Sequence, residues 1–337
     1  MNCFRNAVRV VLSSVLVFAS GVSFAGEAPQ PPFGIPPRLG TITDYQPGHS
    51  KNSRQFIVLI QDLHANVGVQ KNIAAVLYRL QRENKKGGSL LVCVEGASGQ
   101  GDVSLLRSLP GPVRHVFEAM LLHRAYLTGA ELAATEAAAD FSQQQVVVFD
   151  HIKRWFTHSP APEPVSLSPI ELWGVDDPDL YRKNWRAAKT VDRDHYPALA
   201  YIKNLRDVLG PGASPELKKE FDLIVKLLLL RLQPEEYKDY LKGRHLIPKG
   251  PPEFENVVKA GETYYEAAEA RSHAMAQNLL KKSKWSPGIT ALITGGFHTQ
   301  EIAGELKRLG VPYMIITPRV EVLDQDQAYR ARLREEE

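Results

Sequence analysis

The strongest constraint on the fold is a pair of short apolar segments separated by a helix-like segment. "FIVLI" (residues 56–60) and "LLVCV" (residues 90–94) are continuous β-rich runs, the pattern of strands that are covered on both faces. Between them, "VQKNIAAVLYRLQREN" carries apolar residues at helical spacing. A strand, a helix and a strand with connections of this length predict a right-handed parallel unit.

The C-terminal part of the chain repeats this alternation. "GITALIT" and "PYMIITP" predict strands, and "HTQEIAGELKRLG" between them predicts a helix that ends at Gly310. The middle of the chain is mostly helical in its periodicity, with two further expected strands in "VVVFDHI" and "IELWGVDD". The sequence therefore predicts an α/β fold with a parallel or mixed central sheet flanked by helices and a helical insertion or cap mid-chain.

The N-terminus predicts export. Residues 1–25 combine two arginines, an apolar stretch and small residues, which is the pattern of a secretory signal peptide cleaved after Ala25. We therefore expect a periplasmic or secreted protein, and an uncleaved N-terminal membrane anchor is the alternative.

The rest of the chain divides into a leader, a domain with an insertion, and a tail. Residues 26–53 are rich in Pro, Gly and Ser and predict a flexible leader that cannot bury a core. Residues 54–325 would form a single α/β domain with its helical insertion at about 178–250. Residues 326–337 would be a charged tail.

Charge and cysteine content exclude several classes of protein. Cleavage would lower the formal net charge from +3 to +1, because it removes Arg5 and Arg9, so charge gives no reason to expect binding to nucleic acid or anionic membranes. Cys93 alone would remain, and one cysteine cannot form an internal disulfide. The sequence also has no G-x-S-x-G elbow, P-loop, G-x-G-x-x-G or H-E-x-x-H motif, which argues against common serine hydrolases and nucleotide enzymes.

Ionisable residues follow three of the predicted strands. "IQDLHAN" places Asp62 and His64 after the first strand, "VEG" places Glu95 after the second, and "TGGFHTQ" places His298 near the C-terminus. Because ligands bind beyond the carboxyl ends of parallel strands, we expect these side chains to meet. The two glycines before His298 would let the backbone turn sharply and approach a ligand closely, with the histidine at the mouth of the site, where it contributes little to the core.

Two chemistries suit this set of residues. Imidazole and carboxylate groups are ligands of divalent metals, and a bound metal would acidify a water molecule. The same histidines and carboxylates could instead act as acid and base without a metal. Spacing does not decide between the two.

Each candidate also has a simpler reading. Asp62 could cap the following turn, whereas Glu95 is costly to bury after so apolar a strand without a partner. Asp177 makes an ordinary helix start, which leaves Asp176 as a further candidate, and Cys93 reads as a core residue. Arg271 would by itself be a solvated helix residue. The remaining histidines without ligand spacing are assigned to the surface or the core: His115, His123, His151, His158, His195 and His245.

The two ends of the domain resemble a known superfamily. "FIVLIQDLHANVGVQKNIAAVLYRL" followed by "LLVCVEG" resembles the opening of the erythromycin esterase-like and ChaN-like proteins. "EARSHAMAQNLLKK" and "ITALITGGFHTQEIAGELKRLGVPYMIITP" resemble the close of the TraB and Tiki proteins. The matches cover roughly a third of the chain, with Gln61 and Asp62 in place of the expected Gly and Glu.

The resemblance implies a role for each matching residue. It implies His64 and His298 as the paired histidines, Glu95 as the acid of the second strand and Arg271 as the helix arginine that faces the site. Combined with the strand-end argument, it predicts Glu95, Arg271 and Asp62 as catalytic residues and His64, His298 and Glu95 as ligands of a divalent metal.

The resemblance also implies two alternative functions. Tiki and erythromycin esterase-like relatives imply an exported hydrolase, expected here to be metal-assisted and to act on a peptide or ester bond of a peptide or small-molecule substrate. ChaN-like relatives imply instead a haem-binding or other ligand-binding protein without catalysis. Fold analogy does not choose between these.

Overall fold

The computed structural model describes most of the 337-residue chain: residues 30–48, 55–84, 88–136, 169–209 and 212–320. The chain divides into two units, Met1–Gln30 and Pro31–Glu337, and every element below belongs to the second unit. The expected signal peptide, the strand in "VVVFDHI" and the charged tail lie outside the described residues.

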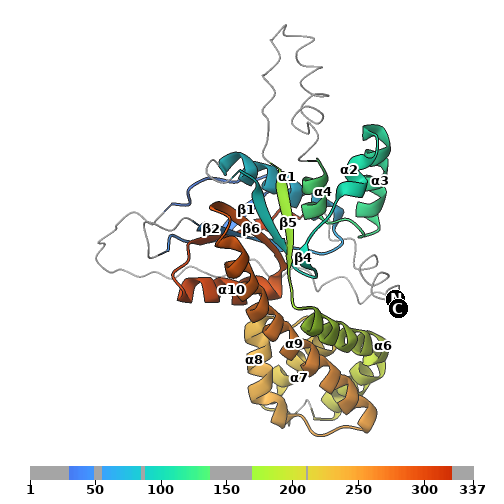
Figure 1. The fold of residues 1–337 in the computed structure, drawn as a ribbon. Coiled ribbons are helices and arrows are strands. Elements are labelled where there is room, and N and C mark those ends of the chain that lie inside the picture. The colour runs from blue at the N-terminus through green and yellow to red at the C-terminus, as the bar shows by residue number, and fades with distance from the viewer. Residues whose placement is uncertain (1–29, 49–54, 85–87, 137–168, 210–211, 321–337) are drawn as a thin grey trace, which may run out of the picture. The chain divides into compact units, whose positions relative to one another are not determined.

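In the part of the chain that the structure describes, seven strands form one mixed sheet (Figure 1). The strands are β1 (Gly40–Gln46), β2 (Gln55–Asp62), β3 (Leu90–Val94), β4 (Ser98–Gln100), β5 (Ile170–Val175), β6 (Gly288–Gly295) and β7 (Tyr313–Pro318). Their order across the sheet is β1-β7-β2-β6-β3-β5-β4. The inner neighbours are parallel and the edge strands β1 and β4 pair antiparallel, which confirms the predicted parallel or mixed sheet.

Helices flank the sheet and form the helical segment in the middle of the chain. They are α1 (Val67–Glu83), α2 (Ser104–Ser108), α3 (Gly111–His123), α4 (Gly129–Glu136), α6 (Pro178–Leu209), α7 (Pro215–Leu228), α8 (Pro234–Gly243), the 3-10 turn η2 (Arg244–Leu246), α9 (Pro252–Ser283) and α10 (Gly296–Arg308). Capping side chains set where several begin: Asn66 accepts from the backbone N–H of Val69 at 3.0 Å at the start of α1. The predicted mid-chain insertion is present as α6, α7 and α8.

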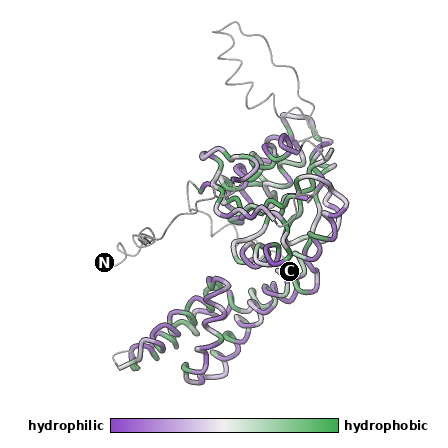
Figure 2. The backbone as a smooth tube through the Cα atoms, turned by 90° about the vertical axis from the view of Figure 1, so that its left-hand side faces the viewer, coloured by the Kyte–Doolittle hydropathy of each residue, from purple (hydrophilic) through white to green (hydrophobic). Residues whose placement is uncertain are grey.

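The central strands are apolar throughout because both faces of the sheet are covered. Val58 and Ile60 of β2 point into a core that they share with α1 and α4. The intervening residues Ile57 and Leu59 point into a core that they share with α9 and α10. Figure 2 shows hydrophobic colour along the strands and alternating colours along the insertion helices, as expected for elements buried on two faces and on one face.

Helix α9 belongs to two hydrophobic cores. Phe254 and Val258, in its first half, pack with α6, α7 and α8. Met275 and Leu279, in its second half, pack against the sheet. One continuous helix of 32 residues therefore joins the insertion to the sheet and carries Arg271 between the two cores.

The predicted leader contains a strand, so the boundary at residue 54 is corrected. β1 pairs with β7 from Gly40 opposite Pro318 to Gln46 opposite Tyr313. Residues before it also pack on the sheet, since Phe33 contacts the central core and its ring lies 6.1 Å from that of Phe56. The proline-rich stretch before this edge strand predicts a flexible segment, and the strand's hydrogen-bond partner is far away in the sequence. The strand is therefore not recognisable from the local pattern.

Candidate functional site

Three neighbouring parallel strands end at one edge of the sheet, where the predicted side chains meet. β2 ends at Asp62, which lies opposite Gly295 at the end of β6. Glu95 directly follows β3, and its backbone N–H donates to the carbonyl oxygen of Ile293 in β6 at 3.1 Å. The strand order β2-β6-β3 therefore brings together the strand ends that carry Asp62, His64, Glu95 and His298.

His64 and Asp62 form a hydrogen-bonded pair, with Nδ1 of the imidazole 2.7 Å from Oδ2 of the carboxylate. The other Asp62 oxygen accepts a hydrogen bond from Nε2 of Gln70 in α1 at 2.5 Å. Desolvation alone would lower the pKa of His64, but the adjacent Asp62 outweighs it and raises that pKa to about 9. Asp62 therefore orients and charges His64, while Asn66 caps the following helix.

Both carboxylate oxygens of Glu95 have partners at this edge. Its Oε1 accepts from Arg271 Nη2 at 2.8 Å and lies 3.3 Å from Nε2 of His298. Its Oε2 accepts from the backbone N–H of Gly295 at 2.8 Å. Burial would raise the pKa of Glu95, but His298, Arg271 and His64 together hold that pKa well below its ordinary value. Glu95 is therefore ionised.

Arg271 points into the site, as the resemblance implies, and its simpler reading as a solvated residue is wrong. The side chain is 5% exposed and donates to both oxygens of Asp176, with Nη2 to Oδ2 at 2.6 Å. Its Nη1 donates to Asn184 Oδ1 at 3.0 Å, and the guanidinium lies 5.1 Å from the centre of the Tyr181 ring. Through these contacts and the hydrogen bond to Glu95, Arg271 joins α9 to α6 and to the end of β5.

Asp176 and Asp177 have the two different roles that the sequence suggests. Asp177 accepts from the backbone N–H groups of Asp179 and Leu180 at 2.9 and 3.0 Å, which is helix capping at the start of α6. Asp176 is buried beside Arg271 and also accepts from the backbone N–H of Gly96 at 3.0 Å. The further candidate Asp176 is thus part of the site's supporting network.

Gly295 leaves space between His64 and Glu95. A Cβ atom at this position would lie 3.6 Å from Nε2 of His64 and 3.7 Å from Oε2 of Glu95. The backbone of Gly295 has φ −59° and ψ 158°, which any residue can adopt. Neither the backbone angles nor these ordinary contact distances require a glycine, but a methyl group here would occupy the space between His64 and Glu95, whereas a Cβ at Gly296 would meet nothing within 4 Å.

His298 lies in the first turn of α10 and is 5% exposed, so its expected position at the mouth of the site is corrected. Its Nδ1 lies 2.9 Å from the hydroxyl of Ser272 in α9. Beside it is a cavity of about 120 Å³ whose lining includes Leu232, Tyr264, Tyr265 and Phe297. Arg231 and Gln233 also line this cavity, so both aromatic rings and polar side chains surround the space next to the imidazole.

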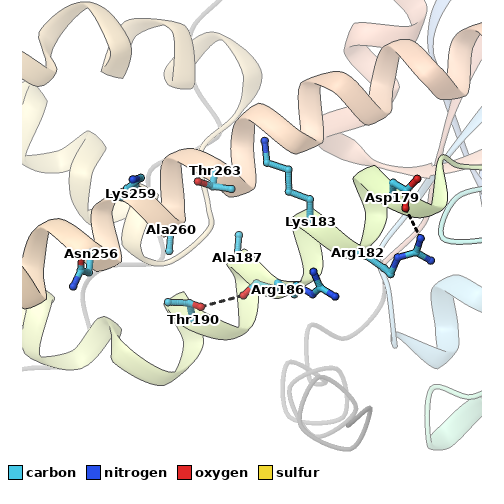
Figure 3. A pocket seen from close by; sticks show the side chains of 10 residues that line it. All are labelled: Asp179, Arg182, Lys183, Arg186, Ala187, Thr190, Asn256, Lys259, Ala260 and Thr263. Carbon is cyan, nitrogen blue, oxygen red and sulfur yellow. Dashed lines mark hydrogen bonds and ion pairs between the residues drawn. The ribbon is translucent and has the colours of Figure 1, made fainter.

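A larger cavity of about 460 Å³ lies between α6 and α9 (Figure 3). Its lining carries four cations, Arg182, Lys183, Arg186 and Lys259, and one acid, Asp179, which pairs with Arg182. We assign the candidate site to the strand ends despite the smaller cavity there, because Glu95 and His64, whose pKa values are both shifted, converge at that edge.

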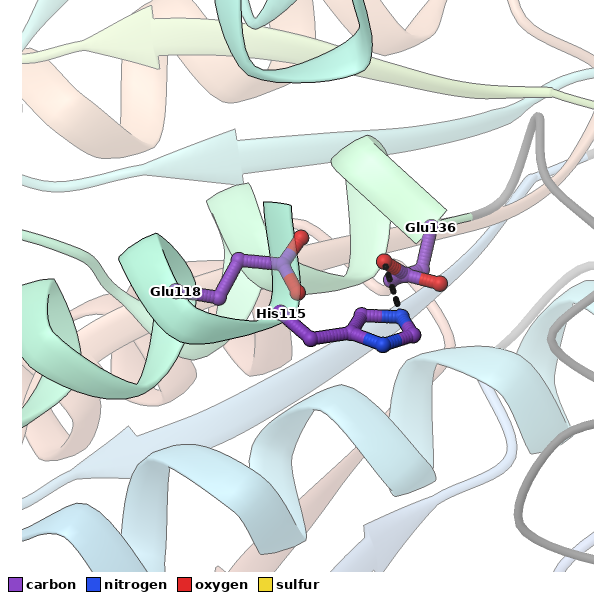
Figure 4. Close-up of side chains that lie close together, drawn as sticks. All are labelled: His115, Glu118 and Glu136. Carbon is purple, nitrogen blue, oxygen red and sulfur yellow. Dashed lines mark ion pairs between the residues drawn. The ribbon is translucent and has the colours of Figure 1, made fainter. Parts of the chain in front are cut away.

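A second cluster consists of His115 and Glu118 on α3 and Glu136 at the end of α4 (Figure 4). One ligand atom from each residue lies within 4.8 Å of the others, so the group could hold a metal. Neither glutamate is among the site residues predicted from the sequence, and His115 is predicted to lie at the surface or in the core. The sequence signal that could have found this cluster is the i, i+3 spacing of His115 and Glu118, which places both on one face of a helix. Glu136 joins them only through packing.

The sheet-edge residues do not form a comparable set of metal ligands. Among the described residues, the 4.8 Å separation is met by the His115 cluster and not by His64, Glu95 and His298 together. The Glu95 oxygen that faces His298 also accepts from Arg271, so a fixed cation already neutralises it. As arranged, these three residues do not fit a closed metal site, and a metal there stays a prediction.

Searches of protein-family models, curated proteins and solved structures found no match to this chain. The superfamily resemblance therefore stays a prediction based on the motifs themselves. Within the described ranges, no helix has the length and apolar character needed to cross a bilayer.

Proposed function

We propose that the chain is a hydrolase that cleaves an ester or peptide bond at this edge of the sheet. The observation that supports the proposal is the pair His64 and Glu95, whose Nε2 and Oε2 atoms face the same space above Gly295. A group bound there would have a protonated imidazole on one side and a carboxylate on the other. Hydrolysis needs such a pair, because one proton leaves the attacking water and another joins the leaving group.

Glu95 and His64 would divide these proton transfers. Glu95 accepts a hydrogen bond and then a proton from the water, whose oxygen adds to the carbonyl carbon of the substrate. The C–O or C–N bond then breaks, and His64 donates its proton to the departing oxygen or nitrogen. Asp62 keeps His64 protonated near neutral pH, which suits a general acid.

Arg271 and His298 would support the reacting pair in different ways. The guanidinium of Arg271 is occupied by Asp176, Asn184 and Glu95, so Arg271 is a positioning residue that fixes the carboxylate. His298 contacts Glu95 and also lines the 120 Å³ cavity, where a substrate group would meet both aromatic rings and the polar side chains of Arg231 and Gln233.

The sequence predicts a metal-assisted form of the same hydrolysis, with His64, His298 and Glu95 as ligands. The separation of these ligand atoms favours the acid–base form instead. Chelation separates the two forms experimentally. The ChaN-like alternative, haem binding, would appear as a Soret band in the purified protein.

Substitutions of His64 by Ala and of Glu95 by Gln test the proposal with a series of p-nitrophenyl esters and fluorogenic peptides. Each variant should lose roughly 100-fold or more in kcat/KM, because positioned acids and bases contribute about 10²- to 10⁴-fold. EDTA should leave the rate of the parent protein unchanged at room temperature. Gly296→Ala is a matched control, since its new methyl group meets nothing within 4 Å.

Other outcomes would contradict the proposal in distinct ways. Full activity in both variants would show that hydrolysis does not take place at the sheet edge. Activity lost to EDTA and regained with a divalent ion would replace the acid–base form by the metal-assisted one. A Soret band in a protein that cleaves none of the substrates would favour the haem-binding alternative.

A further inference from the structure

The cluster on α3 and α4 has more buried negative charge than its neighbours balance. Glu118 and Glu136 are 4% and 1% exposed. In the part of the chain that the structure describes, one guanidinium faces them: Nε of Arg114 donates to Glu136 Oε1 at 3.0 Å and lies 3.8 Å from Glu118 Oε1. A buried carboxylate without full compensation is costly, so two carboxylates beside one arginine call for another positive group.

One oxygen of this cluster has no hydrogen-bond partner among the described residues. Oε1 of Glu118 is buried and accepts no hydrogen bond from any described residue. Figure 4 shows the Glu118 carboxylate turned toward the imidazole of His115 and the carboxylate of Glu136. Buried polar atoms in proteins almost always have a partner, so this oxygen indicates a missing ligand.

We propose that His115, Glu118 and Glu136 bind a first-row divalent cation, such as Zn²⁺ or Mn²⁺, that ties α3 to α4. One imidazole and two carboxylates are a suitable ligand set for such an ion. Metal bonds of about 2.1 Å place ligand atoms roughly 3 to 4 Å apart, close to the observed separations of up to 4.8 Å. Nε2 of His115 already lies 3.6 Å from Glu136 Oε1, and its side chain is 42% exposed, which gives the ion a route of entry.

The competing explanation is a proton in place of the metal. Burial beside Glu136 raises the pKa of Glu118 to about 8, so a proton held by Glu118 could also balance the charge. A proton involves only the two glutamates, whereas a metal also needs the imidazole of His115. The histidine therefore separates the two explanations.

Metal titration of the chelator-treated full chain tests the inference, with Zn²⁺ and Mn²⁺ as probes. Calorimetry should find one ion per chain, and saturation at about 100 times Kd should raise Tm by roughly 5 °C. His115→Ala and Glu118→Gln should each weaken binding at least about 10-fold. His123→Ala removes an exposed histidine from the same helix, and His64→Ala alters the sheet edge, so both should bind like the parent.

Three results would overturn the inference. They are no binding by the parent protein, equal binding by His115→Ala, and equal binding by a Glu118→Gln variant whose circular dichroism matches the parent. Because binding and Tm are measured without a substrate, failure here is distinct from failure of the proposed hydrolase.

Discussion

At the scale of single residues, the two histidines of the sheet edge differ in their surroundings. The side chain of His64 is 43% exposed, and the adjacent Asp62 raises its pKa. His298 is buried between Ser272 and Glu95. The same residue type at two neighbouring strand ends therefore serves different purposes, because its partners and not its spacing fix its protonation and reach.

The charge on His64 predicts the pH dependence of hydrolysis. A general acid works only while it is protonated, so kcat/KM should stay level near neutral pH and fall as the pH rises through about 9, the raised pKa of His64. Asp62→Asn removes the group that raises this pKa and should move the fall toward the ordinary value of about 6.5. A rate that instead rises between about pH 7 and pH 9 would make neutral His64 the base.

The space above Gly295 predicts the effect of a single methyl group. Gly295→Ala should keep the stability of the parent, because its Cβ contacts at 3.6 and 3.7 Å are ordinary and its backbone angles suit alanine. The methyl group would occupy the space between His64 and Glu95, so kcat/KM should fall by roughly 10- to 100-fold. Comparing Gly295→Ala with Gly296→Ala by thermal melts and rates checks this; an equal rate in the two variants would show that the space is not used.

At the scale of elements, an edge strand shows where local pattern is insufficient. The inner strands are identified by their uninterrupted apolar runs, because both of their faces are buried. β1 has a mixed pattern and follows a proline-rich stretch, so its strand state depends on hydrogen bonds to β7. Segments of this kind are poorly predicted from sequence because their stabilising partner is remote.

The pairing of β1 predicts that the segment before β2 stabilises the protein. A variant that starts at residue 51 should melt roughly 10 °C below one that starts at residue 30, since it loses β1 and the packing of Phe33, Ile35 and Leu39. Differential scanning calorimetry of the two variants measures the difference. Equal melting temperatures would show that the leader is dispensable for folding, as its proline density suggests.

At the scale of the whole molecule, α9 connects the insertion to the chemistry at the sheet edge. Its Arg271 ties Glu95 to Asp176 and Asn184, so β3, β5 and α6 are held by one side chain. The insertion and α9 also supply most of the lining of the cavity beside His298. The middle of the chain therefore shapes the cavity beside His298.

Three features could be predicted from the sequence: the alternating strands and helices, the helical insertion, and the strand ends that carry ionisable residues. These follow from local periodicity, which depends on neighbours a few residues away. Other features could not be predicted, because they appear only once the chain is folded: Arg271 binds Asp176, 95 residues away, Gly295 leaves space between His64 and Glu95, and Glu136 joins His115 and Glu118. Such partnerships depend on packing between distant segments, which no local pattern records.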